Sequence, residues 1–165
     1  MLDLVYLRVG GFDSATDGSI ADPFGALVEM QHEGLIRHLG LSTVSAEQIA
    51  EARAIASVVS VQNFYDIANR EDDAVVDALA EDGIAYVPYF PLGGFTPLQS
   101  DVLDDVAAKL DSNVMALALA WLLQRSPNIM LIPGTSPAAH LREIIAAARL
   151  ELPPEAIEKL DGIAV

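Results

Sequence analysis

Residues 34–62 read GLIRHLGLSTVSAEQIAEARAIASVVSVQ, and this stretch decides the class of fold that we expect. Its residues 38–41 predict a short strand, and the β-branched, apolar run 58–62 predicts a second one. Between them, residues 45–48 match the Ser-x-x-Gln capping box, so we expect a helix from there to about residue 56. The stretch therefore predicts a strand, a helix and a second strand in succession.

The same alternation extends over the rest of the chain. The expected strands are residues 2–7, 38–41, 58–62, 84–90 and 129–132. The expected helices are residues 24–32, 45–56, 72–80, 101–110, 114–123, 138–148 and 153–160. Gly34 suits the end of the first helix, and Ser136 and Pro137 suit the N-cap and N1 positions of the helix at 138–148. Strands that alternate with helices in this way predict a parallel sheet covered by helices.

The pattern leaves two architectures open, an open doubly wound sheet and an arc of a (β/α) barrel. Neither G-x-G-x-x-G nor a P-loop, the usual phosphate-binding motifs of open sheets, occurs in the sequence. In both architectures ligands bind at the carboxyl ends of the strands. Those ends are rich in hydrogen-bonding groups and include an aromatic face, which suits a polar, planar ligand. They are Arg8, Ser42-Thr43, Gln62-Asn63, Tyr89-Phe90 and Gly134-Thr135-Ser136.

Composition and charge limit the kinds of partner. The 165 residues are 52% hydrophobic and 20% charged, which predicts a single globular domain over residues 1–165. A formal net charge of -15 argues against nucleic-acid or anionic-membrane partners, because phosphate groups require a basic surface. There is no cysteine, and no acidic residues have the spacing of a metal site. The acidic run 71–73 is expected to be the solvated start of a helix. We see no targeting segment, and the apolar run 114–123 is too short for a membrane span, so we expect a cytoplasmic protein.

Five motifs resemble, in order, those of the aldo-keto reductase family. They are residues 34–42 (GLIRHLGLS), 61–65 (VQNFY), 89–94 (YFPLGG), 118–123 (ALAWLL) and 132–136 (IPGTS) with 140–143 (HLRE). The resemblance covers essentially the whole chain. It implies a partial (β/α)8 TIM-type barrel of five parallel βα units, the C-terminal strands four to eight of that barrel.

The family binds NADP(H) in an extended pose without a Rossmann motif, and the resemblance implies where its parts would lie. Ser42 and Gln62 would hold the nicotinamide carboxamide, with Asn63 beside them, while Tyr89 would stack on the nicotinamide ring. The other implied contacts are Leu92 and Gly93 along the pyrophosphate, Gly134, Thr135 and Ser136 around the adenosine phosphate, and His140 and Glu143 on the helix that follows. The phosphate would lie at a helix N-terminus, where free N–H groups favour an anion.

The chain departs from the family pattern at Arg8, which occupies the place of the family's catalytic His. Arg donates hydrogen bonds but stays charged, so it cannot shuttle a proton. The family's catalytic Tyr, Lys and Asp come from the first three βα units, which we expect this chain to lack. The resemblance thus implies a parent enzyme that reduces small aldehydes and ketones with NADP(H). The isolated chain is expected to bind the cofactor weakly, with negligible activity.

Other interpretations of the chain stay open. It could be a non-catalytic nucleotide-binding or oligomeric module derived from the family, or a truncated product with no separate function. In each case the strands at 2–7 and 129–132 would both lack a neighbour on one side. Both are apolar and carry no internal Lys or Pro, so we expect a homo-oligomer that covers these edges.

Overall fold

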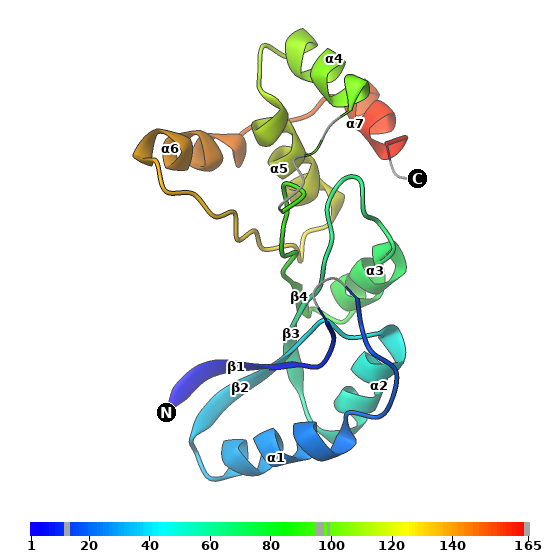
Figure 1. Cartoon of the computed structure of the whole chain (residues 1–165), viewed down its shortest axis with the longest axis vertical. Helices are drawn as coiled ribbons and strands as arrows, with labels where there is room; N and C mark the ends of the chain where they lie inside the picture. The colour runs from blue at the N-terminus through cyan, green and yellow to red at the C-terminus, as the bar shows by residue number, and fades with distance from the viewer. Residues whose placement is uncertain (12–13, 95–97, 99, 164–165) are drawn as a thin grey trace.

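The computed structural model describes residues 1–11, 14–94, 98 and 100–163, and Figure 1 shows how its elements are arranged. The strands are β1 (Leu2–Arg8), β2 (Ile36–Ser42), β3 (Val58–Gln62) and β4 (Ala85–Tyr86). The helices are α1 (Ala21–His32), α2 (Ala46–Ile55), α3 (Asp73–Glu81), α4 (Asp101–Lys109), α5 (Val114–Arg125), α6 (Ala138–Ala147) and α7 (Pro154–Asp161).

The four strands form one parallel sheet in the order β1-β2-β3-β4. Arg8 on β1 pairs with Ser42 on β2, and Ser42 pairs in turn with Gln62 on β3. The carboxyl ends of three strands therefore lie side by side. This arrangement confirms the expected α/β class with parallel strands.

The strand predicted over residues 84–90 is shorter than expected. Only Ala85–Tyr86 forms β4, and Tyr89 then makes a single parallel bridge with Phe64. Pro88 lies between them and has no N–H to donate, so the hydrogen-bonded ladder is interrupted there.

The prediction of a strand over residues 129–132 is also wrong, because these residues do not form a ladder of hydrogen bonds. Ile129 forms one isolated bridge with Tyr86, supported by a hydrogen bond from the Met130 N–H to the Tyr86 carbonyl at 2.9 Å. Met130 itself is 60% exposed, and Pro133 follows without an N–H. The described sheet thus has four strands and two isolated bridges, Phe64 with Tyr89 and Tyr86 with Ile129, where the sequence predicts five strands.

The helix ends follow the sequence signals closely. Ser45 Oγ accepts from the Gln48 N–H at 3.3 Å and Gln48 Oε1 accepts from the Ser45 N–H at 3.0 Å, which confirms the capping box of α2. Gly34 follows α1 with a φ of +76°, as expected for a glycine that ends a helix. At α6 the prediction is wrong by one residue, because Pro137, not Ser136, holds the N-cap position.

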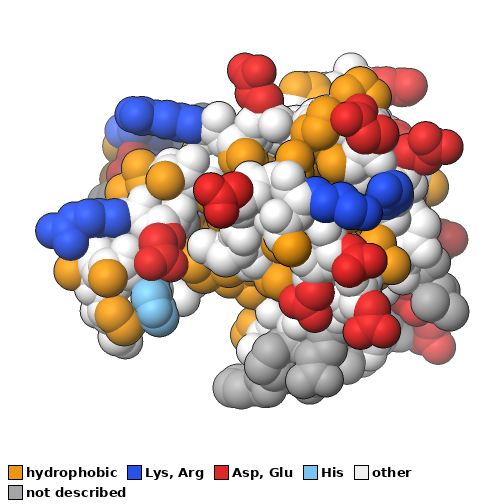
Figure 2. All heavy atoms as spheres, turned by 90° about the horizontal axis from the view of Figure 1, so that it is seen from above, with side chains coloured by type: hydrophobic (Ala, Val, Ile, Leu, Met, Phe, Trp, Pro, Cys, Tyr) orange, Lys and Arg blue, Asp and Glu red, His pale blue; other side chains and the backbone are white. Residues whose placement is uncertain are grey.

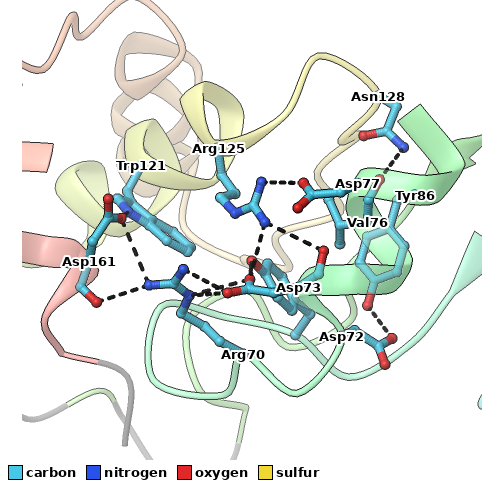
Figure 3. A network of polar contacts seen from close by, with 11 residues as sticks. Arg70, Asp72, Asp73, Val76, Asp77, Tyr86, Trp121, Arg125, Asn128 and Asp161 are labelled. Carbon is cyan, nitrogen blue, oxygen red and sulfur yellow. Dashed lines mark hydrogen bonds and ion pairs between the residues drawn. The ribbon is translucent and has the colours of Figure 1, made fainter. Parts of the chain in front are cut away.

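Side-chain contacts join α3 to the C-terminal helices (Figure 3). Arg70, just before α3, donates to Asp73 at 2.7 Å, and its guanidinium carbon lies 5.2 Å from the centroid of the Trp121 ring on α5. Trp121 Nε1 donates to Asp161 on α7 at 2.9 Å, and Arg125 on α5 donates to Asp77 on α3 at 2.7 Å. Helices α5 and α7 are therefore joined to α3 and the residues before it through the buried Trp121 ring and through half-buried and exposed charged groups.

Figure 2 shows apolar side chains at the surface among the acidic groups. Exposed apolar residues include some on β1 and some on and before α6. Leu2 on the free side of β1 is 62% exposed. Ile132 is 49% exposed, and Leu141 and Ile145 on α6 are 50% and 58% exposed. Within the described ranges, no single helix is long and apolar enough to cross a membrane, and only α4 with α5, bent by 92°, meets those criteria as a pair.

Candidate functional site

A cavity of about 770 Å³ opens at the carboxyl ends of the strands. Thr43 follows β2, Asn63 follows β3 and Tyr89 follows β4, and all three line it. Phe64 and Asp72 add an aromatic edge and a carboxylate. The cavity lies where parallel α/β folds bind their ligands, and it combines an aromatic face with a few convergent polar groups.

The Tyr89 side chain forms the aromatic face of this cavity. It is 9% exposed, and its ring stacks on Phe64 with 5.9 Å between centroids and 18° between planes. Phe90 meets the same ring edge-on at 5.4 Å, and the Tyr89 hydroxyl lies 3.3 Å from Thr43 Oγ1. These contacts fix the orientation of a ring that suits stacking on a flat heteroaromatic group.

Thr43 joins the ends of the strands to one another. Its N–H donates to the Gln62 carbonyl at 2.9 Å, and its own carbonyl accepts from the Gly10 N–H at 3.0 Å. Its φ of +57° lies in the left-handed region, which β-branched residues rarely adopt and which is often found at functional sites. A Cβ on residue 10 would lie 2.4 Å from Thr43 Cγ2, so this close approach requires Gly10.

Ser42 and Gln62 are direct neighbours on β2 and β3. Ser42 is 2% exposed, with Oγ 3.5 Å from Thr43 Oγ1, and it does not line the cavity. Gln62 is half-buried, and within the described residues its side-chain amide has no hydrogen-bond partner. Buried amides normally have partners, so the Gln62 amide, which does not line the cavity but lies next to Asn63, is able to accept a further hydrogen bond. The cofactor roles of both residues stay predictions.

Asn63 uses all of its hydrogen-bonding groups within the protein. Its Nδ2 donates to the Val44 carbonyl at 2.8 Å and to Asp72 Oδ2 at 2.7 Å. Its Oδ1 accepts from the Val44 N–H at 3.1 Å. This geometry makes Asn63 a residue that positions the loop after β2 and the start of α3, and its expected place beside the nicotinamide stays a prediction.

Asp72 is a partly buried carboxylate in the wall of the cavity. Its Oδ2 accepts from Asn63 Nδ2 at 2.7 Å. The same oxygen accepts from the Tyr86 hydroxyl, also at 2.7 Å (Figure 3). Burial raises the pKa of the Asp72 carboxyl above its usual value, and the two hydrogen bonds offset only part of that increase. Burial, with the Asp72 charge, also raises the pKa of Tyr86 well above its usual range. The expectation of a solvated acidic helix start is therefore wrong at Asp72, because two buried partners draw it inward.

Arg8 ends β1 and reaches the aromatic face. Its Nη2 donates to the Gly11 carbonyl at 2.6 Å, and its guanidinium carbon lies 5.6 Å from the centroid of the Tyr89 ring. A cation at this distance is attracted by the electrons of the ring. The residue at the place of the family's His is thus in contact with the residue expected to stack on the nicotinamide.

Leu92 and Gly93, expected along the pyrophosphate, do not line the cavity. Leu92 packs against an apolar cluster of Ala116, Leu119 and Ala147 between α5 and α6. Gly93 has a φ of +85°, which permits the turn after Phe90. Leu92 is therefore a packing residue in this structure, and the roles of both in cofactor binding stay predictions.

The residues expected around the adenosine phosphate lie apart from this cavity. Gly134, Thr135 and Ser136 are exposed before α6, and His140 is exposed on α6 itself. Glu143 lines a separate hollow between the start of α5 and the end of α6. The residues predicted around the nicotinamide thus lie together at the strand ends. The residues predicted around the adenosine phosphate lie elsewhere and are exposed to solvent.

The sequence placed Thr43 at a strand end without a specific role, and it did not predict Phe64 or Asp72 in the cavity wall. Thr43 and Phe64 directly follow predicted site residues, so their position at the strand ends was a usable signal. Asp72 gave no such signal, because its partner Tyr86 is distant in sequence. Over the described residues, no group of three or more His, Asp or Glu could hold a metal ion.

Comparison with known sequences gives one family and several relatives. The sequence model of the Aldo/keto reductase family matches residues 1–165. A pyridoxine 4-dehydrogenase from Escherichia coli (strain K12) is 61% identical over 165 residues, which cover 99% of this chain and 58% of that protein. An uncharacterized oxidoreductase from Schizosaccharomyces pombe is 43% identical over 141 residues, covering 85% of this chain and 46% of that protein. The chain thus spans about half the length of the curated relatives it matches.

Comparison with solved structures confirms a partial TIM-type barrel. A thermostable aldo-keto reductase in complex with the inhibitor epalrestat superposes with a TM-score of 0.83 at 25% identity, over 98% of this chain and 59% of that one. An aldo-keto reductase from Klebsiella pneumoniae in complex with NADPH gives a TM-score of 0.79 at 22% identity, over 98% and 58%. The family match covers this chain from end to end, so it does not decide that the chain is the C-terminal part of the barrel.

Proposed function

Since the chain belongs to the aldo/keto reductase family, we propose that it forms the nicotinamide-holding part of an NADP(H)-dependent oxidoreductase. The observation that carries this proposal is the convergence of Thr43, Asn63 and Tyr89 around a cavity of about 770 Å³ at the strand ends, with Gln62 next to Asn63 at the end of β3. The order of the five sequence motifs supports our further proposal that the chain corresponds to the C-terminal strands of the barrel.

The residues present fit one half of the cofactor better than the other. The Tyr89 ring offers a flat face, and the Gln62 amide has no hydrogen-bond partner within the described residues, so both suit the ring and carboxamide of nicotinamide. Glu71 and Asp72 line the same cavity and would repel phosphates there. The phosphates would therefore have to extend toward the exposed Gly134 segment, as the resemblance implies. Because the cavity suits the nicotinamide and not the phosphates, we propose that the chain alone binds NADP(H) weakly.

We propose an aromatic alcohol and its aldehyde as the substrate pair, pyridoxine among them. The 61% identity with a pyridoxine 4-dehydrogenase supports this choice, and so do the aromatic side chains of Phe64 and Phe90 beside Tyr89. The nicotinamide supplies hydride chemistry at the carbon that carries the oxygen. Arg8 would donate a hydrogen bond to that oxygen and stabilise negative charge on it.

A non-catalytic nucleotide-binding role is the second candidate, and Arg8 is the observation that favours it. A guanidinium stays protonated and cannot exchange a proton with the substrate oxygen as an imidazole can. We expect little turnover from this chain alone, which spans 58% of its Escherichia coli relative. Cofactor binding without turnover by a full-length protein that contains this chain would favour the non-catalytic role.

Titration of the chain with NADPH, followed by cofactor fluorescence, tests the proposal. We expect saturable binding, and Tyr89→Ala should weaken it by about 1 kcal/mol or more because the stacking face is lost. Tyr89→Phe keeps the ring and should bind nearly as well as the natural chain. No saturable change at millimolar cofactor, or equal binding by Tyr89→Ala, would contradict the proposed site.

A further inference from the structure

We infer that α7 keeps one wall of the cavity ordered for its ligand, and that Asp161 is the residue through which it acts. The wall is the loop between β3 and α3, residues 63–72. The described residues that line the cavity all lie between 14 and 89, so α7 acts on it from outside. The inference rests on the proposed function and extends it, since it names a positioning residue on a helix that the proposed site does not include.

The side chains at the end of this loop point in two directions. Three of them line the cavity: Asn69, Glu71 and Asp72. Arg70 lies between them in the chain and extends toward α5 and α7 (Figure 3). Its guanidinium donates to Asp73 at 2.7 Å and to the Asp161 carbonyl at 3.0 Å. The contacts of Arg70 with α7 therefore bear on the position of its neighbours in the cavity wall.

Asp161 joins Arg70 to the buried tryptophan of α5. Its Oδ1 accepts from Trp121 Nε1 at 2.9 Å and lies 3.8 Å from Arg70 Nη1. Trp121 is 1% exposed, and the centroid of its ring lies 5.2 Å from the Arg70 guanidinium carbon. The same ring stacks on Tyr65, near the start of the loop, with 6.3 Å between centroids. One side chain of α7 thus completes a set of contacts that holds the loop at two positions.

The hydrogen bond from Trp121 contributes more to this arrangement than the ion pair does. The Asp161 side chain is 46% exposed, so solvent weakens its attraction to Arg70. The Trp121 N–H belongs to a buried ring, and a buried donor that loses its acceptor is unfavourable. Without the Asp161 carboxylate we therefore expect the Trp121 ring, and the Arg70 side chain packed against it, to become less ordered.

The middle of the loop has contacts of its own, which limits the part that α7 controls. Asp66 accepts from the Ala68 and Asn69 N–H groups at 2.8 Å and 3.0 Å, and these bonds do not involve α7. The part that depends on Asp161 is therefore residues 70–72. Two backbone hydrogen bonds report on it, from the Asp73 N–H to the Arg70 carbonyl at 3.1 Å and from the Val76 N–H to the Asp72 carbonyl at 2.8 Å.

Amide hydrogen exchange and NADPH titration of the natural chain and of Asp161→Ala test the inference. The Asp73 and Val76 amides should exchange about tenfold faster in Asp161→Ala, whereas the Ile49 amide on α2 should be unchanged. NADPH should bind Asp161→Ala about threefold more weakly, because a less ordered wall must be ordered on binding. Asp161→Asn keeps an oxygen that can accept from Trp121, so it should show the same changes at smaller size. It serves as the test if Asp161→Ala does not fold.

Glu158→Gln is the matched control, since it removes one exposed acidic group from the same helix and should change neither measurement. Equal acceleration of exchange at Ile49 would mean that Asp161 only stabilises the whole fold, which would overturn the inference. Unchanged NADPH affinity in Asp161→Ala would also overturn it, because the order of the wall would then not matter for the ligand. If NADPH does not bind the natural chain, the proposed function itself is wrong, whereas unchanged exchange at Asp73 and Val76 refutes only the role of Asp161.

Discussion

Asp72 shows how single residues set the properties of this site. Its carboxylate accepts hydrogen bonds from Asn63 and Tyr86, yet burial still raises its pKa above the usual value. Nearby Asp73 shows the reverse balance: burial alone would raise its pKa, but hydrogen bonds from Arg70 and Tyr65 outweigh burial and lower it. The pKa values of these two consecutive carboxyls are therefore shifted in opposite directions.

The raised pKa of the Asp72 carboxyl predicts how the free energy of unfolding depends on pH. A carboxyl with a raised pKa in the folded state holds its proton more tightly there than in the unfolded chain. The free energy of unfolding therefore falls as the pH rises from the unfolded value of 3.8 through the raised pKa of Asp72. Asp72→Asn keeps an oxygen that can accept both hydrogen bonds. It should remove the fall in the free energy of unfolding that deprotonation of Asp72 causes.

Denaturant unfolding at about pH 4 and about pH 7 checks this. Relative to the natural chain, Asp72→Asn should gain stability as the pH rises. Asp105→Asn, an exposed aspartate on α4, serves as the control and should show little change. A stability difference between Asp72→Asn and the natural chain that is constant with pH would refute this description of Asp72.

At the residue scale, sequence similarity was a good guide only where the backbone places the side chain. Gln62 and Tyr89 were predicted because their motifs fall on strand ends, and the structure brings both ends together. The positioning role of Asn63 was not predictable, because it depends on hydrogen bonds to Val44 and Asp72 across a loop. A matching motif does not show which atoms of a side chain already form hydrogen bonds within the protein.

At the scale of elements, the start of α2 both stabilises the fold and forms part of the cavity wall. Ser45 caps α2 through the reciprocal bonds with Gln48, and the Gln48 amide also donates to the Thr16 carbonyl at 2.8 Å and the Gly18 carbonyl at 2.9 Å. Ser45 and Ala46 line the cavity. The cap thus links the helix to the loop that follows β1.

Ser45→Ala should lower the free energy of unfolding by about 1 kcal/mol, the usual effect of losing an N-cap hydroxyl. Ser57→Ala, at an exposed loop position between α2 and β3, should have almost no effect. Thermal unfolding of both variants measures the difference. Equal stability of the two would mean that the capping box contributes nothing in this chain.

Helices were easier to predict than strands, for a physical reason. A helix carries its own start and stop signals, so the predicted and observed bounds of α2 and α4 differ by about one residue. Strand length depends on the neighbouring strand, and Pro88 ends β4 after Tyr86 although the sequence continues apolar. The single bridge at Ile129 likewise depends on its partner and not on its own residues.

At the scale of the whole molecule, two apolar regions are open to a partner. The free side of β1 exposes Leu2 and Leu4, and α6 with the segment before it exposes Ile132, Leu141 and Ile145. Edge strands without Lys or Pro tend to pair with other chains. We therefore propose that the chain forms a homo-oligomer in solution.

Light scattering after gel filtration tests that proposal. We expect a mass above that of one chain, and Leu2→Lys at the β1 edge should shift the distribution toward monomer, because a charge blocks strand pairing. Lys109→Gln on α4 is a distant control. A monodisperse monomer with one sharp unfolding transition would show that the described sheet is stable without a neighbour.

The most direct test of the proposed site is the response of backbone amides of the nitrogen-labelled chain to NADPH in solution. We predict saturable shifts of the resonances of Thr43, Gln62 and Tyr89, which meet at the strand ends, and little change at Arg37 near the other end of β2. Shifts confined to other parts of the chain, or none at millimolar cofactor, would contradict the assignment of a nicotinamide site to these residues.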